Sequence, residues 1–226
     1  MTSASANRIL SDRERSKLDD TSDTFFYAQP RLVTHVDETF IDRLTQLYAA
    51  RLRPQSRVLD LMSSWVSHLP DIPFDHVEGH GMNEAELAKN PRLDHYFVQN
   101  LNHSPSLPLE DDSFDAVLIA VSVQYLQEPE TVFQEIRRVL KPDGQAIVSF
   151  SNRMFYQKAI AAWRDGSDSD HVNLVCRYFW NTPGFKKPQI VAEANDEVPA
   201  FLRMMGFGSR DPFYAIVAEA EPLAPT

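Results

Sequence analysis

The stretch from Leu107 to Asn152 limits most strongly what this chain can fold into. It contains a nearly continuous apolar run at 116–123, as expected for a strand that is covered on both faces. Apolar residues then recur at helical spacing after Pro129, a residue type that the first turn of a helix tolerates. The sequence Lys-Pro-Asp-Gly at 141–144 ends this helix, and a second apolar run follows at 146–150. Strand, helix and strand in this order predict a right-handed βαβ unit of a parallel sheet.

Composition narrows the class of protein. The 226 residues carry a formal net charge of −10, and 43% of them are hydrophobic. These values are typical of one globular domain, and the negative charge argues against nucleic acid and anionic membranes as partners. No apolar run is long enough to span a membrane, and the single Cys176 has no partner for a disulfide or a metal. We expect a disordered N-terminal tail at 1–24, one domain at 25–226 and a cytoplasmic location, with the oligomeric state left open.

Three motifs in the stretch from Leu107 to Asn152 carry a family resemblance. They are LPLEDDSFDAV, QYL and FQEIRRVLKPDG, and in this order and spacing they resemble the C-terminal half of the type 11 class I methyltransferase domain. The resemblance implies an α/β fold with a Rossmann-like doubly wound sheet, mostly parallel with an antiparallel last strand. It also implies S-adenosyl-L-methionine as cofactor and a small molecule as methyl acceptor.

The segment after the predicted first strand, 57–61, departs from the family pattern. In the family this strand ends in an acidic residue and a glycine-rich turn, whose backbone approaches the cofactor closely. Asp60 matches, but Met62, Ser64 and Val66 stand in place of the glycines. Each side chain in a left-handed conformation costs about 1 kcal/mol or more, so we expect the turn to follow another path.

Two interpretations of this loop stay open. In the first, Ser63 and Ser64 offer hydroxyl groups to the cofactor, and binding is retained. In the second, Met62 and Trp65 fill the space that the cofactor would occupy, and the site is dead.

The cofactor-binding residues are inferred by carrying the family pattern onto this sequence. The pattern places a ribose-binding carboxylate at Gly81, and a glycine cannot accept those hydrogen bonds. Glu78, on the same face of the predicted second strand (75–78) as His80, is a candidate replacement. Asn100 follows the predicted third strand (95–98), where it either contacts adenine or forms a turn. The predicted cofactor-binding residues are Asp60, Met62, Ser63, Ser64, Gly79, Gly81, Met82, Asn100, Leu101 and Val121.

The predicted catalytic and substrate-binding residues are inferred from fewer observations. His80 and Tyr125 are the predicted catalytic residues, because an imidazole that titrates near neutrality suits a base, although a hydrogen-bonded turn histidine is the alternative. The aromatic segment 25–35 forms either part of a lid or an anchor for the N-terminus. Ligands of parallel sheets bind beyond the carboxyl ends of the strands, and loops in that region supply the predicted substrate-binding residues Gln124, Asn152 and Trp180.

The remaining pattern predicts the other elements. Helices are expected at 37–52, with Asp37 as cap, and at 154–164, 171–180 and 199–205, with Gly206 ending the last one. A final strand is expected at 213–218.

Two functions of different classes follow. The first is a small-molecule methyltransferase, and the second is a non-catalytic binding or regulatory protein on the same fold that has lost the cofactor loop. A nicotinamide oxidoreductase would need G-x-G-x-x-G after the first strand, and this motif is absent.

Overall fold

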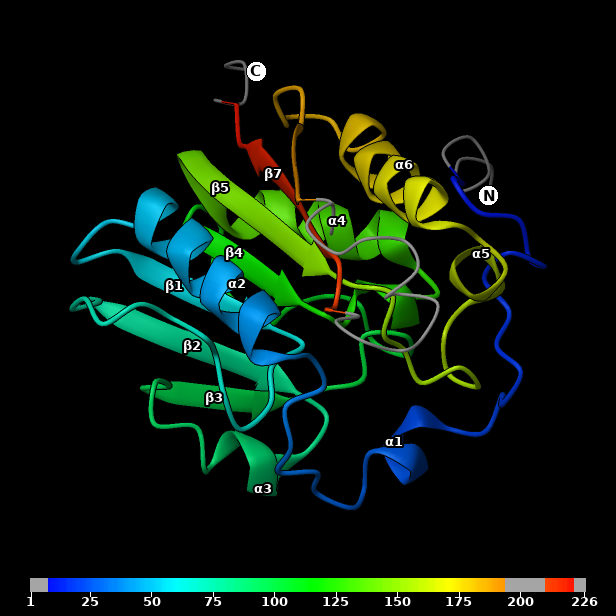
Figure 1. Ribbon diagram of the computed structural model, residues 1–226. Helices are drawn as coiled ribbons and strands as arrows, with labels where there is room; N and C mark the ends of the chain where they lie inside the picture. Colours follow the sequence, from blue (N-terminus) through cyan, green and yellow to red (C-terminus); the bar gives the residue numbers. More distant parts are fainter. Residues whose placement is uncertain (1–7, 194–209, 222–226) are drawn as a thin grey trace.

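A sheet of seven strands forms the centre of the computed structural model (Figure 1), which describes residues 8–193 and 210–221. The strand order is β3-β2-β1-β4-β5-β7-β6, parallel from β3 to β5 and antiparallel for β7 and β6. This is the doubly wound, mostly parallel sheet that the sequence predicted. The strands are β1 Arg57–Leu61, β2 His76–Gly81, β3 His95–Val98, β4 Phe114–Ala120, β5 Leu140–Phe150, β6 Gln189–Glu193 and β7 Phe213–Glu219.

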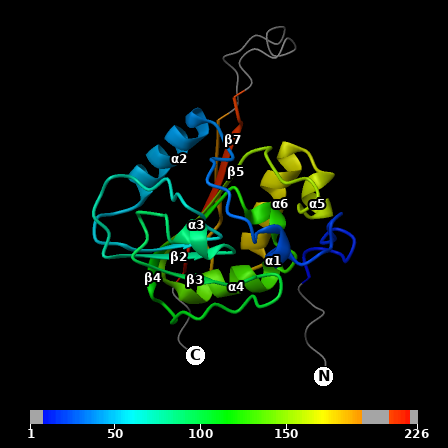
Figure 2. The same ribbon diagram turned by 90° about the horizontal axis from the view of Figure 1, so that it is seen from below.

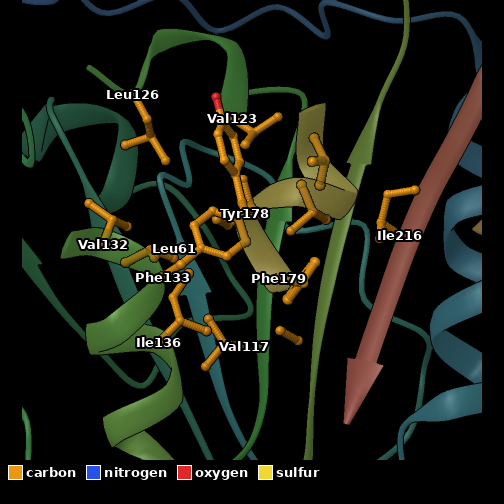
Figure 3. Close-up of a cluster of buried hydrophobic side chains, with 14 of the residues drawn as sticks. Leu61, Val117, Val123, Leu126, Val132, Phe133, Ile136, Tyr178, Phe179 and Ile216 are labelled. Carbon is orange, nitrogen blue, oxygen red and sulfur yellow. The ribbon is translucent and has the colours of Figure 1, made fainter. Parts of the chain in front are cut away.

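Helices cover both faces of this sheet (Figure 2). Neighbouring residues of one strand point to opposite faces: Val58 packs in the cluster that contains α2, whereas Leu59 packs in the cluster that contains α4 and α6. Phe133 of α4 meets Tyr178 and Phe179 of α6 in the second cluster (Figure 3). The helices are α1 Asp23–Phe26, α2 Glu38–Arg51, α3 Glu84–Leu87, α4 Pro129–Val139, α5 Ala161–Arg164 and α6 Asp168–Trp180.

Most predicted elements are confirmed. The first and third strands, α2 with Asp37 as its cap, and α4 starting at Pro129 lie where the sequence placed them. The second strand is longer than expected, because β2 pairs with β1 as far as Gly79 and with β3 as far as Gly81. The predicted helix at 199–205 lies outside the described residues. None of the helices in the described ranges has the length and apolar character needed to cross a membrane.

The helix predicted at 154–164 is wrong except for its last turn, α5. Tertiary partners take several backbone donors of this segment: Ile160 N–H donates to the Gln124 carbonyl, and Ala161 N–H donates to the Ser16 carbonyl. The Lys158 side chain is fully buried and donates to the Thr21 carbonyl. These contacts outside the segment replace the bonds that a helix would have made.

Residues 8–24, which we expected to be disordered, contact the domain in the structure. Leu10 is buried in the core cluster with α4, and the buried Arg15 guanidinium pairs with Glu128 (2.8 Å) and Glu130 (3.0 Å). The division of the chain at residue 24 stays a prediction.

Candidate functional site

The site is a cavity of about 280 Å³ beyond the carboxyl ends of β1, β2 and β4. The arrowheads of the parallel strands point toward the side of the sheet on which α1 lies (Figure 1). In a doubly wound sheet this edge is where ligands bind. The cavity lining includes eleven of the predicted site residues: Asp60, Met62, Ser63, Ser64, His80, Gly81, Met82, Asn100, Leu101, Val121 and Tyr125.

The first loop rests directly on β2. Met62 N–H donates to His80 Nδ1 (3.1 Å), and Ser63 N–H donates to the His80 carbonyl (2.7 Å). Met62 has a φ of 59°, so this methionine adopts a left-handed conformation in spite of its side chain. Its cost is roughly 1–2 kcal/mol, which the two hydrogen bonds help to offset.

The loop does not fill the site. Met62 lines the cavity, and Trp65 turns to the N-terminal segment, where its Nε1–H donates to the Val33 carbonyl (3.2 Å). The interpretation in which the loop fills the cofactor space is therefore wrong for Trp65, whereas Met62 forms part of the cavity wall.

His80 holds this loop in place and cannot act as a base. The side chain is 1% exposed, and Nδ1 accepts from Met62, so the proton is on Nε2, which donates to the Gln99 carbonyl (2.9 Å). Burial lowers the pKa of His80 to about 4. Because both ring nitrogens are occupied, the predicted catalytic role is replaced by a positioning role between β1 and β2.

Asp60 is the buried acid of the site. Ser63 Oγ–H donates to its carboxylate (2.6 Å), yet burial dominates and raises the pKa of Asp60 to about 6. The Asp60 carboxyl group therefore lies in an environment that disfavours its charged form. It is located near the carboxyl end of β1, which borders the cavity.

Asp60→Asn should change how stability depends on pH. The folded-state pKa of Asp60 lies above the unfolded value, so its stabilising contribution is complete below about pH 4 and is lost as the pH rises through 6. The asparagine variant should therefore gain about 3 kcal/mol relative to the wild type between pH 4 and pH 7. Urea unfolding of both proteins across this range measures the difference. A difference that is independent of pH would show that burial does not perturb this carboxyl group.

Two predicted residues on β2 have other roles. A Cβ at Gly79 would lie 2.3 Å from Leu93 Cδ1, so this glycine accommodates a core side chain and does not line the cavity. Glu78 bonds to His76 Nε2 (2.9 Å) and His95 Nδ1 (2.6 Å), and it also lies outside the lining. Glu78 is thus not available to replace the ribose-binding acid.

The surroundings of Gly81 explain why the ribose-binding acid of the family pattern cannot occupy position 81. A Cβ on Gly81 would lie 2.6 Å from the Ser63 carbonyl oxygen, so the first loop occupies the space of any side chain there. The close approach of the loop to β2 requires glycine.

The cavity offers polar groups that a cofactor could use. Ser122 Oγ is buried, belongs to the lining at the end of β4, and has no hydrogen-bond partner within the described part of the chain. Asn100 and Leu101 follow β3, and Met82 follows β2. A hydroxyl without a partner next to amide and apolar side chains fits an adenosine-containing ligand.

The predicted acceptor residues are only partly brought together. Tyr125 lines the cavity, its Oη accepts from Phe155 N–H (2.8 Å), and burial raises its pKa to about 12. Gln124 is fully buried and donates to the Val121 carbonyl (2.9 Å), so it supports the loop from behind. Asn152 is exposed outside the lining, and Trp180 is 57% exposed at the end of α6. Gln124, Asn152 and Trp180 therefore do not contact the cavity, contrary to the prediction.

The sequence analysis missed the extent to which the N-terminal segment builds the site. Residues 23–36, here called the strap, contribute Asp23, Tyr27, Arg31 and His35 to the lining. Asn83 Nδ2–H donates to the Tyr27 carbonyl (2.8 Å), and Glu86 accepts from Arg31 N–H (2.6 Å), so α3 and its cap hold the strap backbone. The aromatic run at 25–27 was the signal: the segment lines the cavity, as a lid would, and Phe26 and Tyr27 pack on Phe155, as an anchor would.

Comparison with known proteins agrees with this geometry. Residues 80–148 match the family model described as a methyltransferase domain. The match is limited to residues 80–148 and gives this part of the chain the sequence pattern of a methyltransferase domain. S-adenosyl-L-methionine is the cofactor of that family.

Curated methyltransferases match this chain over only a part of their own length. A malonyl-[acyl-carrier protein] O-methyltransferase of Alcanivorax borkumensis is 26% identical over 61% of this chain and 50% of that protein. A demethylmenaquinone methyltransferase of Halalkalibacterium halodurans is 35% identical over 33% of each chain. The chain therefore spans half or less of the length of these relatives.

Solved structures share the fold of this chain. The [4+2]-cyclase SpnF has a TM-score of 0.55 at 20% identity, covering 81% of this chain and 82% of its own. A Haloferax volcanii complex of the Trm112 methyltransferase activator with its methyltransferase partner contains a chain with a TM-score of 0.54 at 16% identity, with coverage of 84% and 93%.

Proposed function

We propose that this protein is an S-adenosylmethionine-dependent methyltransferase that acts on a small-molecule acceptor. The observation that supports it most is the open cavity at the carboxyl ends of β1, β2 and β4, where the loop without glycines still leaves about 280 Å³. The net charge of −10 favours a free small molecule over nucleic acid as the acceptor.

The residues that would hold the cofactor come from four loops. Ser63 and Ser64 lie after β1, Met82 after β2, Asn100 and Leu101 after β3, and Ser122 after β4. The bound cofactor supplies an activated methyl group. The side chains of the protein would orient the acceptor and exclude water, since positioning alone can contribute several kcal/mol to such a transfer.

No base is assigned to this reaction. His80 is occupied at both nitrogens, and Tyr125 with a pKa of about 12 stays neutral and can orient an acceptor by hydrogen bonding. The proposal therefore favours an acceptor that is nucleophilic without losing a proton to His80.

A second function is favoured by a specific observation. The ribose-binding acid is replaced by Gly81, whose side-chain space the Ser63 carbonyl occupies. Without that acid, the chain could be a non-catalytic binding or regulatory protein on a methyltransferase fold. SpnF, which is a [4+2]-cyclase, is a neighbour that illustrates how this fold serves other activities.

Calorimetry with S-adenosylmethionine and S-adenosylhomocysteine separates the two. We expect the wild-type protein to bind both, and Ser64→Trp to lose binding of both because an indole at this lining position would enter the cavity. The thermal transition of the variant serves as the control for folding. If millimolar ligand gives no heat and no thermal shift with the wild type, the methyltransferase proposal fails and the second function remains.

A further inference from the structure

Arg31 lines the cavity, and its guanidinium group packs against three aromatic rings. Its guanidinium carbon lies 4.4 Å from the ring centroid of Phe26, 5.3 Å from that of Phe155 and 5.8 Å from that of Tyr27. Phe26, Tyr27 and Phe155 also contact one another edge to face. Such rings fix the plane of a guanidinium group without using its hydrogen-bond donors.

Most of those donors have no partner among the described residues. One bond is present, from Arg31 Nη2 to the Phe26 carbonyl (3.0 Å), and no carboxylate within residues 8–193 and 210–221 pairs with this guanidinium. The nearby acids have other partners. Glu86 accepts from the backbone N–H of Arg31, and Asp23 pairs with Lys17 (2.7 Å).

The other arginine of the cavity differs in this respect. Arg153 also belongs to the lining, but it forms an ion pair with Asp211 (2.6 Å). Among the described lining residues, Arg31 is thus the half-buried arginine whose guanidinium group has free hydrogen-bond donors and no carboxylate partner.

We infer that Arg31 is a carboxylate-binding residue of this cavity. A guanidinium group matches a carboxylate with two parallel hydrogen bonds, and these are strongest where water is partly excluded. Two ligands could bring such a group: the methionine part of the cofactor, which makes the inference rest on the proposed function, or an acceptor that is itself a carboxylate.

The experiment compares two nucleosides. S-adenosylhomocysteine carries the carboxylate, and methylthioadenosine has the same adenosine and sulfur but lacks the amino-acid part. Both are titrated calorimetrically into the wild type, Arg31→Met and Arg31→Lys. Arg57→Met is the matched control, because Arg57 also lies over an aromatic ring (5.8 Å from Phe114) but at the opposite end of β1.

If the cofactor is the source, Arg31→Met should lose roughly tenfold or more of the affinity for S-adenosylhomocysteine and keep that for methylthioadenosine. Arg31→Lys should retain part of it, and Arg57→Met all of it. The strap backbone is held by Asn83 and Glu86, so the variant keeps the strap in place. An equal loss for both nucleosides would overturn the inference, since Arg31 would then only support the strap.

A second arm addresses the acceptor. Benzoate, an aromatic carboxylate suited to this ring-lined site, is titrated into the protein saturated with S-adenosylhomocysteine. Binding that is present in the wild type and absent in Arg31→Met supports an acceptor carboxylate. If the wild type binds neither nucleoside, the proposed function fails, and benzoate with the free protein still decides the role of Arg31. The inference about Arg31 is overturned if the wild type and Arg31→Met bind S-adenosylhomocysteine, methylthioadenosine and benzoate with equal affinity.

Discussion

Gly81→Ala should weaken binding of S-adenosylhomocysteine by roughly tenfold or more and destabilise the protein by about 1–3 kcal/mol. The added Cβ would lie 2.6 Å from the Ser63 carbonyl oxygen, which is backbone and cannot rotate away. The first loop must then move off β2. Calorimetry and urea unfolding measure the two effects.

The loop cannot move without consequences for the site. Met62 and Ser63 are both held by His80, through its side chain and its carbonyl, so a shift of Ser63 strains both hydrogen bonds. Ser63 also donates to Asp60, whose carboxyl group is buried at the end of β1. The substitution therefore displaces several lining residues at once.

Gly79→Ala is the matched control on the same strand. Its Cβ would meet Leu93 Cδ1 at 2.3 Å, which is the end of a flexible side chain away from the cavity. We expect it to lose stability by overpacking and to keep its affinity for the nucleoside. If both alanines reduce affinity equally, the effect is general destabilisation, and the close approach of loop and strand is not what shapes the site.

The sequence predicted the central βαβ unit well because its pattern is repetitive and local. The apolar run of β4 and the helical spacing of α4 each depend on neighbouring residues only. The extension of β2 through Gly81 was not predictable in this way. Two glycines around a histidine have low strand propensity, and pairing with neighbouring strands makes them a strand: Gly79 pairs with both β1 and β3, and Gly81 pairs with β3.

The candidate site could be located from the sequence, but the roles of its residues could not. The carboxyl ends of parallel strands must meet, so Asp60, Asn100 and Val121 could be placed together before the structure was known. The role of His80 depends on which atoms face its two nitrogens, and no spacing rule reports that. Arg31 was missed for a similar reason, because only the tertiary structure brings Phe155 against the strap.

Lys158 should be the residue on which the strap most depends. Its ammonium group is fully buried and lies 2.6 Å from the Thr21 carbonyl, 3.1 Å from Asp19 and 3.6 Å from Asp23. Asp23 is the first residue of the strap and lines the cavity. Lys158→Met keeps the length of the side chain but removes the buried cation that pairs with Asp19 and Asp23, and removing one partner of a buried ion pair typically costs 3–5 kcal/mol.

We expect this cost to appear first as local opening of the strap, because the hydrogen-bond and ion-pair partners of the Lys158 ammonium group lie at residues 19–23. In Lys158→Met, amide hydrogens of residues 19–31 should exchange faster by about two orders of magnitude, corresponding to about 3 kcal/mol, while those of β1 and β4 stay protected. Lys186→Met, which removes an exposed lysine paired with Asp143 and Glu219, should leave exchange in the strap unchanged. Faster exchange throughout the sheet would mean that Lys158 supports the whole domain, and unchanged exchange at 19–31 would show that the strap is held without it. If only the strap opens, the cavity has a wall whose stability is set by one buried lysine.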